Sequence, residues 1–368
     1  MVFSTDDGLG KIPDDRVPTS PHALADRTKT SGVGGDPGMT AAEHVFGDVR
    51  PFAQCHASTL VRIPDGRFLV AWFGGTREST EDVAIWAAER EPSGSWSPPR
   101  VLARVGEVAH WNPVLFALDD EGRDLVLHFK VGSRIRSWET WSQRSRDAGT
   151  TWSEPAPLVP GDRGGRGAVR CKPIRLASGD WLAGASRERW RRWDAFFDRS
   201  PDGLSDWQAT EEVAIDHRRF GGKGLIQPTL WTSGGARVHA LFRSTDGFVH
   251  RADSEDDGRS WSRPRPLAIP NNNSGIDVVR LEDGRVILAA NPVAGNWAAR
   301  TPLSLLVSGN GGETWPDRID VETDPGEYSY PALITTPAGV ALSYTWNRRR
   351  IAFVEIPSGA LPGNATKT

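Results

Sequence analysis

Apolar residues along the chain occur in pairs of short runs, and a turn separates the two runs of each pair. The first pair is STLVRIPDGRFLVAWFGG (58–75), in which the apolar runs flank Asp65-Gly66. Short apolar runs on either side of a Gly-containing turn predict antiparallel β-hairpins. The unit occurs six times, at 58–75, 113–132, 173–188, 228–245, 276–295 and 331–349.

A second pattern has the same spacing. The motif Ser-x-Asp/Asn-x-Gly-x-Ser/Thr-Trp occurs at 145–152, 254–261 and 308–315, and weaker copies end at Trp96 and Trp207. The tryptophans at 96, 152, 207, 261 and 315 are therefore 56, 55, 54 and 54 residues apart. Repeats of about 55 residues with four strands each are typical of propeller blades. The fold is predicted to be all-β, a six-bladed β-propeller.

The sixth repeat contains three strand-like runs, PALITT, GVALSYTW and RIAFVEI, before the chain ends. Its fourth strand is expected from EHVFGDV (43–49), just before the first repeat, which would close the ring and remove an exposed edge. The predicted organisation is a flexible N-terminal arm over 1–40, a single propeller over 41–358 and a C-terminal tail over 359–368. Residues 1–40 are polar, Gly/Pro-rich and unpatterned.

The aspartates of the repeated motif could suggest a metal or catalytic site. A structural role explains them better, because Asp147, Asp256 and Asn310 can each cap a tight turn while the glycine supplies a positive φ. The tryptophan that ends each motif is then expected to pack between blades. The motifs therefore indicate the fold and carry no chemistry.

Charge and composition exclude several classes of protein. The 368 residues contain 44 Lys and Arg against 47 Asp and Glu, a net charge of −3, which argues against a nucleic-acid partner. No apolar run is long enough to span a membrane. Cys55 and Cys171 cannot staple a fold of this size, and no Cys/His spacing suggests zinc. The N-terminus lacks the apolar core of a secretory signal, so a cytoplasmic location is expected.

Residues just before the first strand of each repeat should line the central funnel, because the inner strands of all blades converge on the axis. These positions are rich in polar and aromatic side chains, namely His56, His110, Trp111, Asn112, Arg170, Lys172, Gln227, Tyr328 and Tyr330. A buried polar ring needs partners or a ligand. A solvent-filled structural channel is the alternative.

Three of these residue types suggest particular roles. His56 and His110 could take or give a proton near neutral pH, unless each is a hydrogen-bonded structural histidine. Trp111 could stack on a sugar face or pack between blades. Lys172 is one of only six lysines in an arginine-rich chain, so a compact cation or proton donor could be needed there.

The repeated motif and the stretch QCHASTLVRIPDGRFLVAWFGGTRESTEDVAIW (54–86) resemble the sialidase (neuraminidase) superfamily, and in particular an uncharacterised sialidase-like branch of bacteria and plants. The resemblance covers roughly residues 50–356 and implies a six-bladed Asp-box (BNR-repeat) propeller. Sialidases hold a sugar carboxylate with three arginines. They attack with a tyrosine that a glutamate activates, and an aspartate serves as the acid.

The resemblance assigns these roles to positions of the chain. Arg243 and Arg300 match the second and third arginines, whereas His56 falls where the first would lie. Tyr328 matches the nucleophile, with Tyr330 as a close competitor. The acid is expected in the cluster that contains Arg77 and Asp82, with Asp82 as the choice. The activating glutamate is missing, because the start of blade four has Gln227.

These matches imply exo-acting glycosidase-type cleavage of a terminal bond next to a carboxylate-bearing sugar, by an enzyme other than a true sialidase. Two retained arginines favour a carboxylate, which a guanidinium group binds in bidentate fashion. One alternative is a uronate lyase, in which His56 or His110 removes the C5 proton and Tyr328 or Tyr330 protonates the leaving oxygen. A second alternative is a non-catalytic sugar-binding propeller. The expected partner is an acidic oligosaccharide, and neither reaction requires a metal or organic cofactor.

Overall fold

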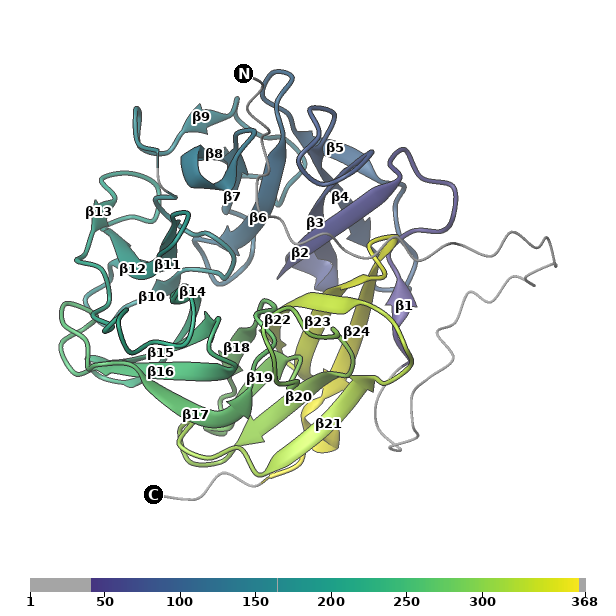
Figure 1. Ribbon diagram of the computed structural model, residues 1–368. Helices are drawn as coiled ribbons and strands as arrows, with labels where there is room; N and C mark the ends of the chain where they lie inside the picture. The colour runs from purple at the N-terminus through teal and green to yellow at the C-terminus, as the bar shows by residue number, and fades with distance from the viewer. Residues whose placement is uncertain (1–40, 164, 364–368) are drawn as a thin grey trace, which may run out of the picture.

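The computed structural model describes residues 41–163 and 165–363, and these form an all-β fold. Six four-stranded antiparallel sheets surround a central axis, which confirms the predicted six-bladed propeller (Figure 1). The predicted arm at 1–40 and the last five residues of the predicted tail lie outside the described residues. Within the described residues, no helix is long and apolar enough to cross a membrane.

Blades one to three follow the chain from the axis outward. Blade one contains β2 (Gln54–Arg62), β3 (Phe68–Gly75), β4 (Ala84–Arg90) and β5 (Arg100–Ala103). Blade two contains β6 (His110–Ala117), β7 (Leu125–Val131), β8 (Glu139–Ser145) and β9 (Ala156–Pro157). Blade three contains β10 (Ile174–Arg175), β11 (Trp181–Glu188), β12 (Trp193–Ser200) and β13 (Gln208–Ala209).

Blades four and five repeat this order, and three short 3₁₀ helices lie outside the strands. Blade four contains β14 (Leu225–Gly234), β15 (Arg237–Ser244), β16 (Phe248–Ser254) and β17 (Arg265–Pro270). Blade five contains β18 (Asp277–Arg280), β19 (Val286–Ala290), β20 (Leu303–Ser308) and β21 (Asp317–Glu322). The 3₁₀ helices are η1 (Pro64–Gly66), η2 (Ile135–Ser137) and η3 (Ser358–Ala360).

Blade six joins the two ends of the propeller. It contains β22 (Tyr328–Thr336), β23 (Gly339–Trp346) and β24 (Arg350–Pro357), and its outer strand is β1 (Glu43–His44) from the start of the described chain. Glu43 pairs with Phe353 and His44 with Ala352 in an antiparallel register. The predicted closure of the last blade by an N-terminal strand is therefore confirmed, and the edge of β24 is covered.

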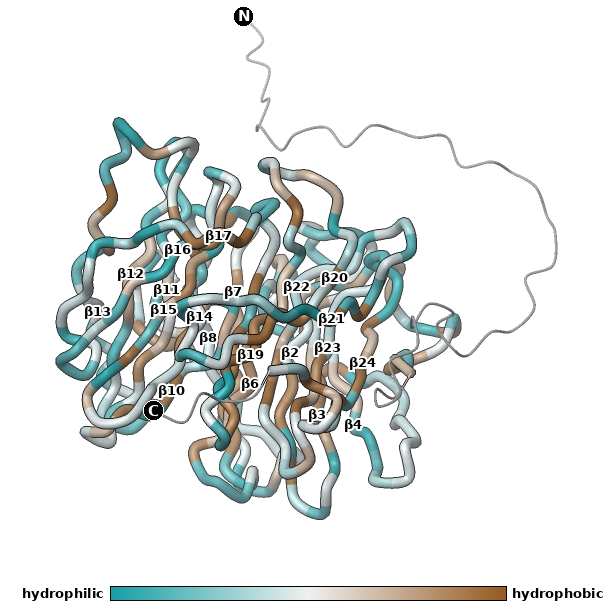
Figure 2. Tube along the Cα trace, turned by 90° about the horizontal axis from the view of Figure 1, so that it is seen from below, coloured by the Kyte–Doolittle hydropathy of each residue, from teal (hydrophilic) through white to brown (hydrophobic). Residues whose placement is uncertain are grey.

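Apolar side chains fill the spaces between neighbouring blades. Figure 2 shows hydrophobic residues along the strands and hydrophilic residues along many of the loops. Between blades one and two, for example, Leu69 and Phe73 share one buried cluster with Leu127 and Phe129. Both faces of a blade are covered by other blades, which explains why the inner hairpins are nearly continuous apolar runs.

The repeated motif forms the same turn in blades two, four and five. In blade two, the Asp147 carboxylate accepts bonds from Ser145 Oγ and Thr151 N, both at 2.8 Å. Asp256 accepts the same bonds from Ser254 Oγ and Ser260 N, again at 2.8 Å. Asn310 makes the corresponding contacts, so an amide serves as well as a carboxylate. These aspartates are satisfied within their own turns, as a structural role requires.

Four inner strands begin with an irregularity of the same kind. Strands β2, β6, β14 and β22 each contain a register shift near the start, between His56 and Thr59 in β2 and at the corresponding places in the others. One residue of each bulge has a positive φ, namely Ala57 (55°), Asn112 (40°), Gln227 (51°) and Tyr330 (53°). A bulge bends its strand and re-aims the nearby side chains. The four bulges therefore shape one end of the axial channel, which we call the site mouth.

Candidate active site

Tyr330 lies at the centre of the site mouth. Arg243 Nη1 donates a hydrogen bond of 2.8 Å to Tyr330 Oη. The guanidinium carbons of Arg170, Arg243 and Arg300 lie 5.3, 5.5 and 5.5 Å from the centre of the Tyr330 ring. These arginines come from blades three, four and five, and cation–π attraction holds them against one aromatic ring.

Arg243 and Arg300 are fixed by neighbouring polar groups. Arg243 Nε donates to Asn273 Oδ1 at 2.8 Å, and Nη1 also donates to Gln227 Oε1 at 3.1 Å. Arg300 Nη1 donates to Glu327 Oε1 at 2.8 Å. The Nη2 nitrogens of both arginines make no hydrogen bond to the part of the chain that the structure describes. Two oriented donor groups are thus available for an anion.

Arg170 has a different environment from the other two. Its side chain is almost fully buried, and Nη2 donates to the carbonyl oxygen of Pro331. Its Nε is buried without a hydrogen-bond partner among the described residues. Arg170 therefore supports Tyr330 from within the channel, and its charge adds to the positive potential there.

A fourth arginine, Arg348, completes the cluster. It follows β23 in blade six with a φ of 52°, and its guanidinium group pairs with Glu78 and Glu327. Although burial opposes its charge, Glu78 and Glu327 raise the pKa of Arg348 further above its ordinary value. Arg348 was not among the site residues predicted from the sequence. The available signal was its place after the second strand of its blade, which is close to the place of Arg243 at the end of β15.

Glu188 brings a carboxyl group to the same region from blade three. It is the last residue of β11, and Gln227 Nε2 donates to Glu188 Oε1 at 3.1 Å. Burial raises the pKa of Glu188 above its ordinary 4.5, against the opposing effects of Arg243 and the Gln227 hydrogen bond. The sequence analysis finds no glutamate at the start of blade four. The structure brings one there from the adjacent blade, linked through Gln227 to Arg243 and Tyr330.

His56 lies against Tyr330, with ring centres 4.2 Å apart. Its Nδ1 is 2.9 Å from Thr345 Oγ1, and Nε2 has no hydrogen-bond partner among the described residues. Burial, followed by the charges of Arg348, Arg300, Arg170 and Arg243, lowers the pKa of His56 well below its ordinary value. The imidazole is therefore neutral at physiological pH, and its Nε2 can accept a proton in the tautomer in which Nδ1 donates to Thr345 Oγ1.

His110 and Trp111 are occupied by structural contacts. His110 Nδ1 lies 2.8 Å from the carbonyl oxygen of Val83, and Val105 N donates to Nε2 at 2.8 Å. Trp111 is buried, and its Nε1 donates to the carbonyl oxygen of Gly132. Both side chains pin loops in place and leave no free group for a substrate. Asn112 sits at the bulge of β6, and its side chain makes no hydrogen bond to another described residue.

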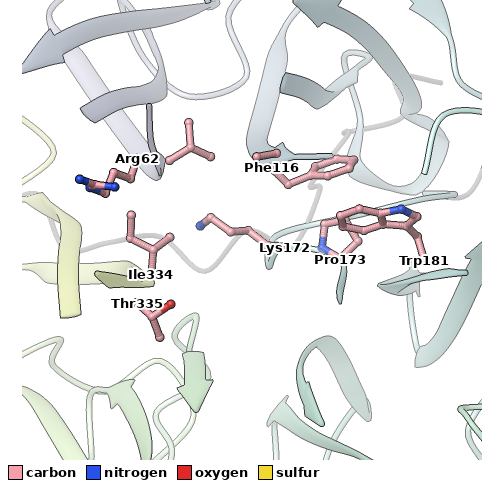
Figure 3. A pocket seen from close by; sticks show the side chains of 9 residues that line it. Arg62, Phe116, Lys172, Pro173, Trp181, Ile334 and Thr335 are labelled. Atoms are coloured by element: carbon pink, nitrogen blue, oxygen red, sulfur yellow. The ribbon is translucent and has the colours of Figure 1, made fainter. Parts of the chain in front are cut away.

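Tyr328 and Lys172 lie away from Tyr330. Tyr328 is buried in the core between blades five and six, with Trp346 and Leu303 in the same cluster. Lys172 lines a cavity of about 230 Å³ at the other end of the channel, where β2 ends at Arg62 and β22 approaches its end at Thr335 (Figure 3). We call this end the opposite mouth. Arg62 lies six positions after His56 along β2, so the two mouths are roughly 20 Å apart.

The loop between β3 and β4 contains Arg77 and Asp82, the two residues of blade one that were predicted for the site. Asp82 is exposed and accepts hydrogen bonds from Thr76 N at 2.6 Å and from Thr80 Oγ1 within that loop. The Thr80 and Thr76 bonds lower the pKa of Asp82, so it is ionised at neutral pH. Arg77 is exposed and has no ion pair among the described residues. Glu78, by contrast, reaches Arg348 at the site mouth.

Comparisons with known proteins agree with this architecture. The family model for the BNR repeat-like domain matches residues 66–342, which is well over half of the chain. The chain belongs to the BNR repeat-like domain family. No curated protein sequence matches the chain.

Solved structures share the fold of this family member. A protein of unknown function from Dyadobacter fermentans DSM 18053 has 16% identity and a TM-score of 0.70. The alignment covers 87% of this chain and 100% of the Dyadobacter chain. The NanB sialidase of Streptococcus pneumoniae has 12% identity and a TM-score of 0.69, and the alignment covers 87% of this chain and 71% of the sialidase chain. The leech intramolecular trans-sialidase has 14% identity and a TM-score of 0.63, and the alignment covers 86% of this chain and 69% of the trans-sialidase chain. At these identities the likeness establishes the sialidase-type propeller alone.

Cationic groups outnumber carboxylates at the site mouth of this BNR-repeat protein. Four guanidinium groups, a phenol and a neutral imidazole converge at the site mouth, and the nearby carboxylates Glu78 and Glu327 are paired with arginines. Within the described residues, no group of three or more His, Cys, Asp or Glu side chains could hold a metal ion. The arrangement can bind a carboxylate, stabilise negative charge on an oxygen and exchange a proton through Glu188 or His56.

Proposed function

We propose that the protein is a carbohydrate-active enzyme that cleaves a terminal bond next to a carboxylate-bearing sugar, by glycosidase-type chemistry. One observation carries the proposal. Tyr330, at the axis, bonds to Arg243 and is surrounded by guanidinium groups, while Glu188 is linked to it through Arg243 and Gln227. The sialidase-type fold supports the class of enzyme but does not define the substrate.

Each group has a role in the proposed reaction. The free Nη2 nitrogens of Arg243 and Arg300 bind the sugar carboxylate, which places the anomeric carbon over Tyr330. Tyr330 gives its hydroxyl proton to the neutral His56 imidazole beside it, and its oxygen forms a bond to that carbon while the bond to the leaving oxygen breaks. The surrounding positive charge stabilises the phenolate character of the attacking oxygen. Water then attacks the same carbon and gives a proton to the Glu188 carboxylate, while the bond to Tyr330 breaks and His56 returns the proton to the tyrosine oxygen.

Glu188 is the proposed source of the proton for the leaving oxygen. Its raised pKa favours the protonated form at a higher pH than for an ordinary glutamate, which suits a general acid. Asp82 remains the acid implied by the sialidase resemblance. Its carboxylate is held in its own loop and has a lowered pKa, so it is the weaker candidate for donating a proton.

A second candidate function is elimination from a uronate. It is favoured by His56, whose Nε2 is free and whose imidazole is neutral beside Tyr330. His56 would remove the C5 proton, the arginines would stabilise the resulting carboxylate-conjugated anion, and Tyr330 would give its proton to the leaving oxygen. The C4–O bond breaks and a C4–C5 double bond forms, so no water is consumed.

Mass spectrometry of products formed in heavy-oxygen water tests the two reactions on sialylated and uronate-capped glycans. Heavy oxygen in the released sugar supports hydrolysis. An unlabelled product that lacks one water and absorbs ultraviolet light through a new double bond supports elimination, and His56→Ala should then abolish it. A product of the same mass without that absorbance indicates transfer within the sugar, which keeps Tyr330 as nucleophile. No product from any substrate would overturn the enzymatic proposal and favour a sugar-binding propeller.

A further inference from the structure

Beyond the site, we infer that the loops over blades two to four bind the continuing chain of an anionic glycan. This inference rests on the proposed function, because it assigns a polyanionic substrate to the same site. The surface consists of exposed cationic residues around an exposed tryptophan, and we call it the cationic rim. It comprises Arg134, Arg136, Arg191, Arg218 and Lys223, with Trp190 at its centre.

The cationic rim adjoins the site mouth at the turn between β11 and β12. Glu188 is the last residue of β11, so the turn to β12 places Trp190 two residues beyond a carboxyl group of the site. The neighbouring loop is tied to this turn, since Trp193 N donates to the carbonyl oxygen of Lys223 at 2.9 Å. On the other side, η2 lies against β11 and carries Arg136. The rim is therefore one continuous surface beside the site mouth.

The cationic side chains of the rim differ from their neighbours in ion pairing. In the described part of the chain, none of its five cationic side chains forms an ion pair. Arg189 and Arg192 differ, because both lie within 4 Å of the Asp194 carboxylate. The protein as a whole has a net charge of −3, so this concentration of unpaired positive charge is a local feature. Clustered like charges repel one another, and a polyanion removes that repulsion.

Trp190 adds a flat apolar surface to these charges. Trp190 is 57% exposed, and the Lys223 ammonium lies 5.9 Å from its ring centre. An exposed aromatic residue among cations provides a stacking surface for a sugar ring whose acidic groups contact the neighbouring side chains. Single-stranded nucleic acid could also use such a surface. Continuity with a site that binds a carboxylate-bearing sugar favours the glycan.

Binding of acidic oligosaccharides of increasing length tests the inference. The probes are the monomer, tetramer and octamer of oligosialic acid and the corresponding hyaluronan fragments, with calorimetry at low and moderate salt. Trp190→Ala and the double variant Arg191→Ser/Arg218→Ser are compared with Arg175→Ser/Arg237→Ser, which removes two exposed, unpaired arginines from the opposite-mouth side. Removal of two exposed cations should weaken octamer binding by about tenfold at low salt and less at higher salt. Binding of the monomer should not change.

The outcomes separate this inference from the proposed function. If rim variants lose octamer affinity while wild-type protein cleaves no bond, the rim is supported and the proposed activity fails. If wild-type protein cleaves an acidic glycan and the rim variants match the control at every length, the inference is overturned. Tighter binding of an oligothymidylate than of every glycan octamer would overturn the assignment to a glycan. Equal losses in the rim and control variants would show a general charge effect and also overturn it.

Discussion

The Asp-box turns and the bulges at the starts of the inner strands each repeat one backbone conformation around the ring. Only the Asp-box turns also repeat their side chains. In the boxes of blades two and four, the side chains repeat with the backbone, and Asp147 and Asp256 make the same hydrogen bonds within their own turns. At the bulges the backbone repeats, but the residue with positive φ is Ala57, Asn112, Gln227 or Tyr330. A turn whose side chains are constant and self-satisfied has a structural role. A bulge whose side chains differ and face one axis provides a site.

The distinction also follows from where the polar groups find their partners. A box aspartate bonds to residues two to four positions away. At the site mouth, Glu78 pairs with Arg348 across 270 positions and Glu188 reaches Gln227 across 39. Hydrogen bonds within one turn form whether or not other blades are altered. Contacts between residues far apart in the sequence form only when the ring of blades is closed. We therefore expect substitutions in the two regions to affect different properties.

The largest effect is expected for Tyr330→Phe. Loss of the hydroxyl group removes the proposed nucleophile, and kcat should fall by about a thousandfold or more. Tyr328→Phe is the matched control two residues away, in the packed core between blades five and six. It should keep its activity and lose about 1 kcal/mol of stability with its buried hydroxyl hydrogen bond. Rate measurements and thermal melts of both variants check this contrast, and a fully active Tyr330→Phe enzyme would contradict it.

The next effect concerns Glu188→Gln. If Glu188 donates a proton, kcat should fall by about a hundredfold, and the decline of activity at rising pH should change with the variant. Stability should change in the opposite direction. Because the pKa of Glu188 in the folded protein lies above the ordinary 4.5, its ionisation destabilises the fold. This loss of stability begins as pH rises past about 4.5 and is complete above the folded pKa. The variant should therefore melt at a higher temperature than wild-type protein at pH 7.

Below about pH 4, where Glu188 is protonated in the folded and unfolded chains, the two proteins should have the same stability. Thermal melts across pH, together with a pH–rate profile, measure both halves of this expectation. Lower stability of the variant at pH 7 would mean that the Glu188 charge stabilises the fold, which would remove the argument for a general acid.

A smaller effect is expected for Arg300→Lys. The ammonium group cannot keep the Glu327 contact and also present a planar pair of donors to a carboxylate. Binding of an acidic sugar should weaken by about 1–3 kcal/mol, and KM should rise accordingly. Arg259→Lys, in the box of blade four, serves as the control because Arg259 is exposed. Equal KM values in the two variants would argue against a carboxylate at Arg300.

The sequence predicts the fold because the information is local and repeated. Hairpin turns, box motifs and their spacing each occur within one blade, and the missing fourth strand of blade six points to the segment that supplies it. The resemblance to sialidases also gave Arg243 and Arg300, which lie beside Tyr330. These two arginines lie in short stretches that match the family pattern locally.

The rest of the site depends on features that local sequence does not carry. In a regular strand, Tyr328 and Tyr330 would point to the same face, but the bulge at Tyr330 separates them. A non-glycine residue with a φ of 53° is uncommon, and nothing in the residues around Tyr330 indicates this conformation. Arg348 and Glu188 reach the site from positions that were not aligned with any family role. Lys172 follows Arg170 by two residues, yet faces the opposite mouth.

The smallest predicted effect lies in the Asp-box region, in Asp256→Asn. Hydrogen bonds from Ser260 lower the pKa of Asp256 from 3.8 to about 2, so its contribution to stability is complete above about pH 4 and is lost as pH falls toward 2. Asn310 already occupies the same place in blade five, where Thr314 N donates to its amide oxygen at 3.0 Å. The variant should therefore fold normally and lose only about 0.5 kcal/mol at neutral pH, because the group is exposed to solvent. The difference between variant and wild-type stability should shrink as pH falls from 4 to 2, with catalysis unchanged at neutral pH. A large loss of activity would show that this box does more than hold its turn, and the division between self-satisfied turns and functional bulges would then fail.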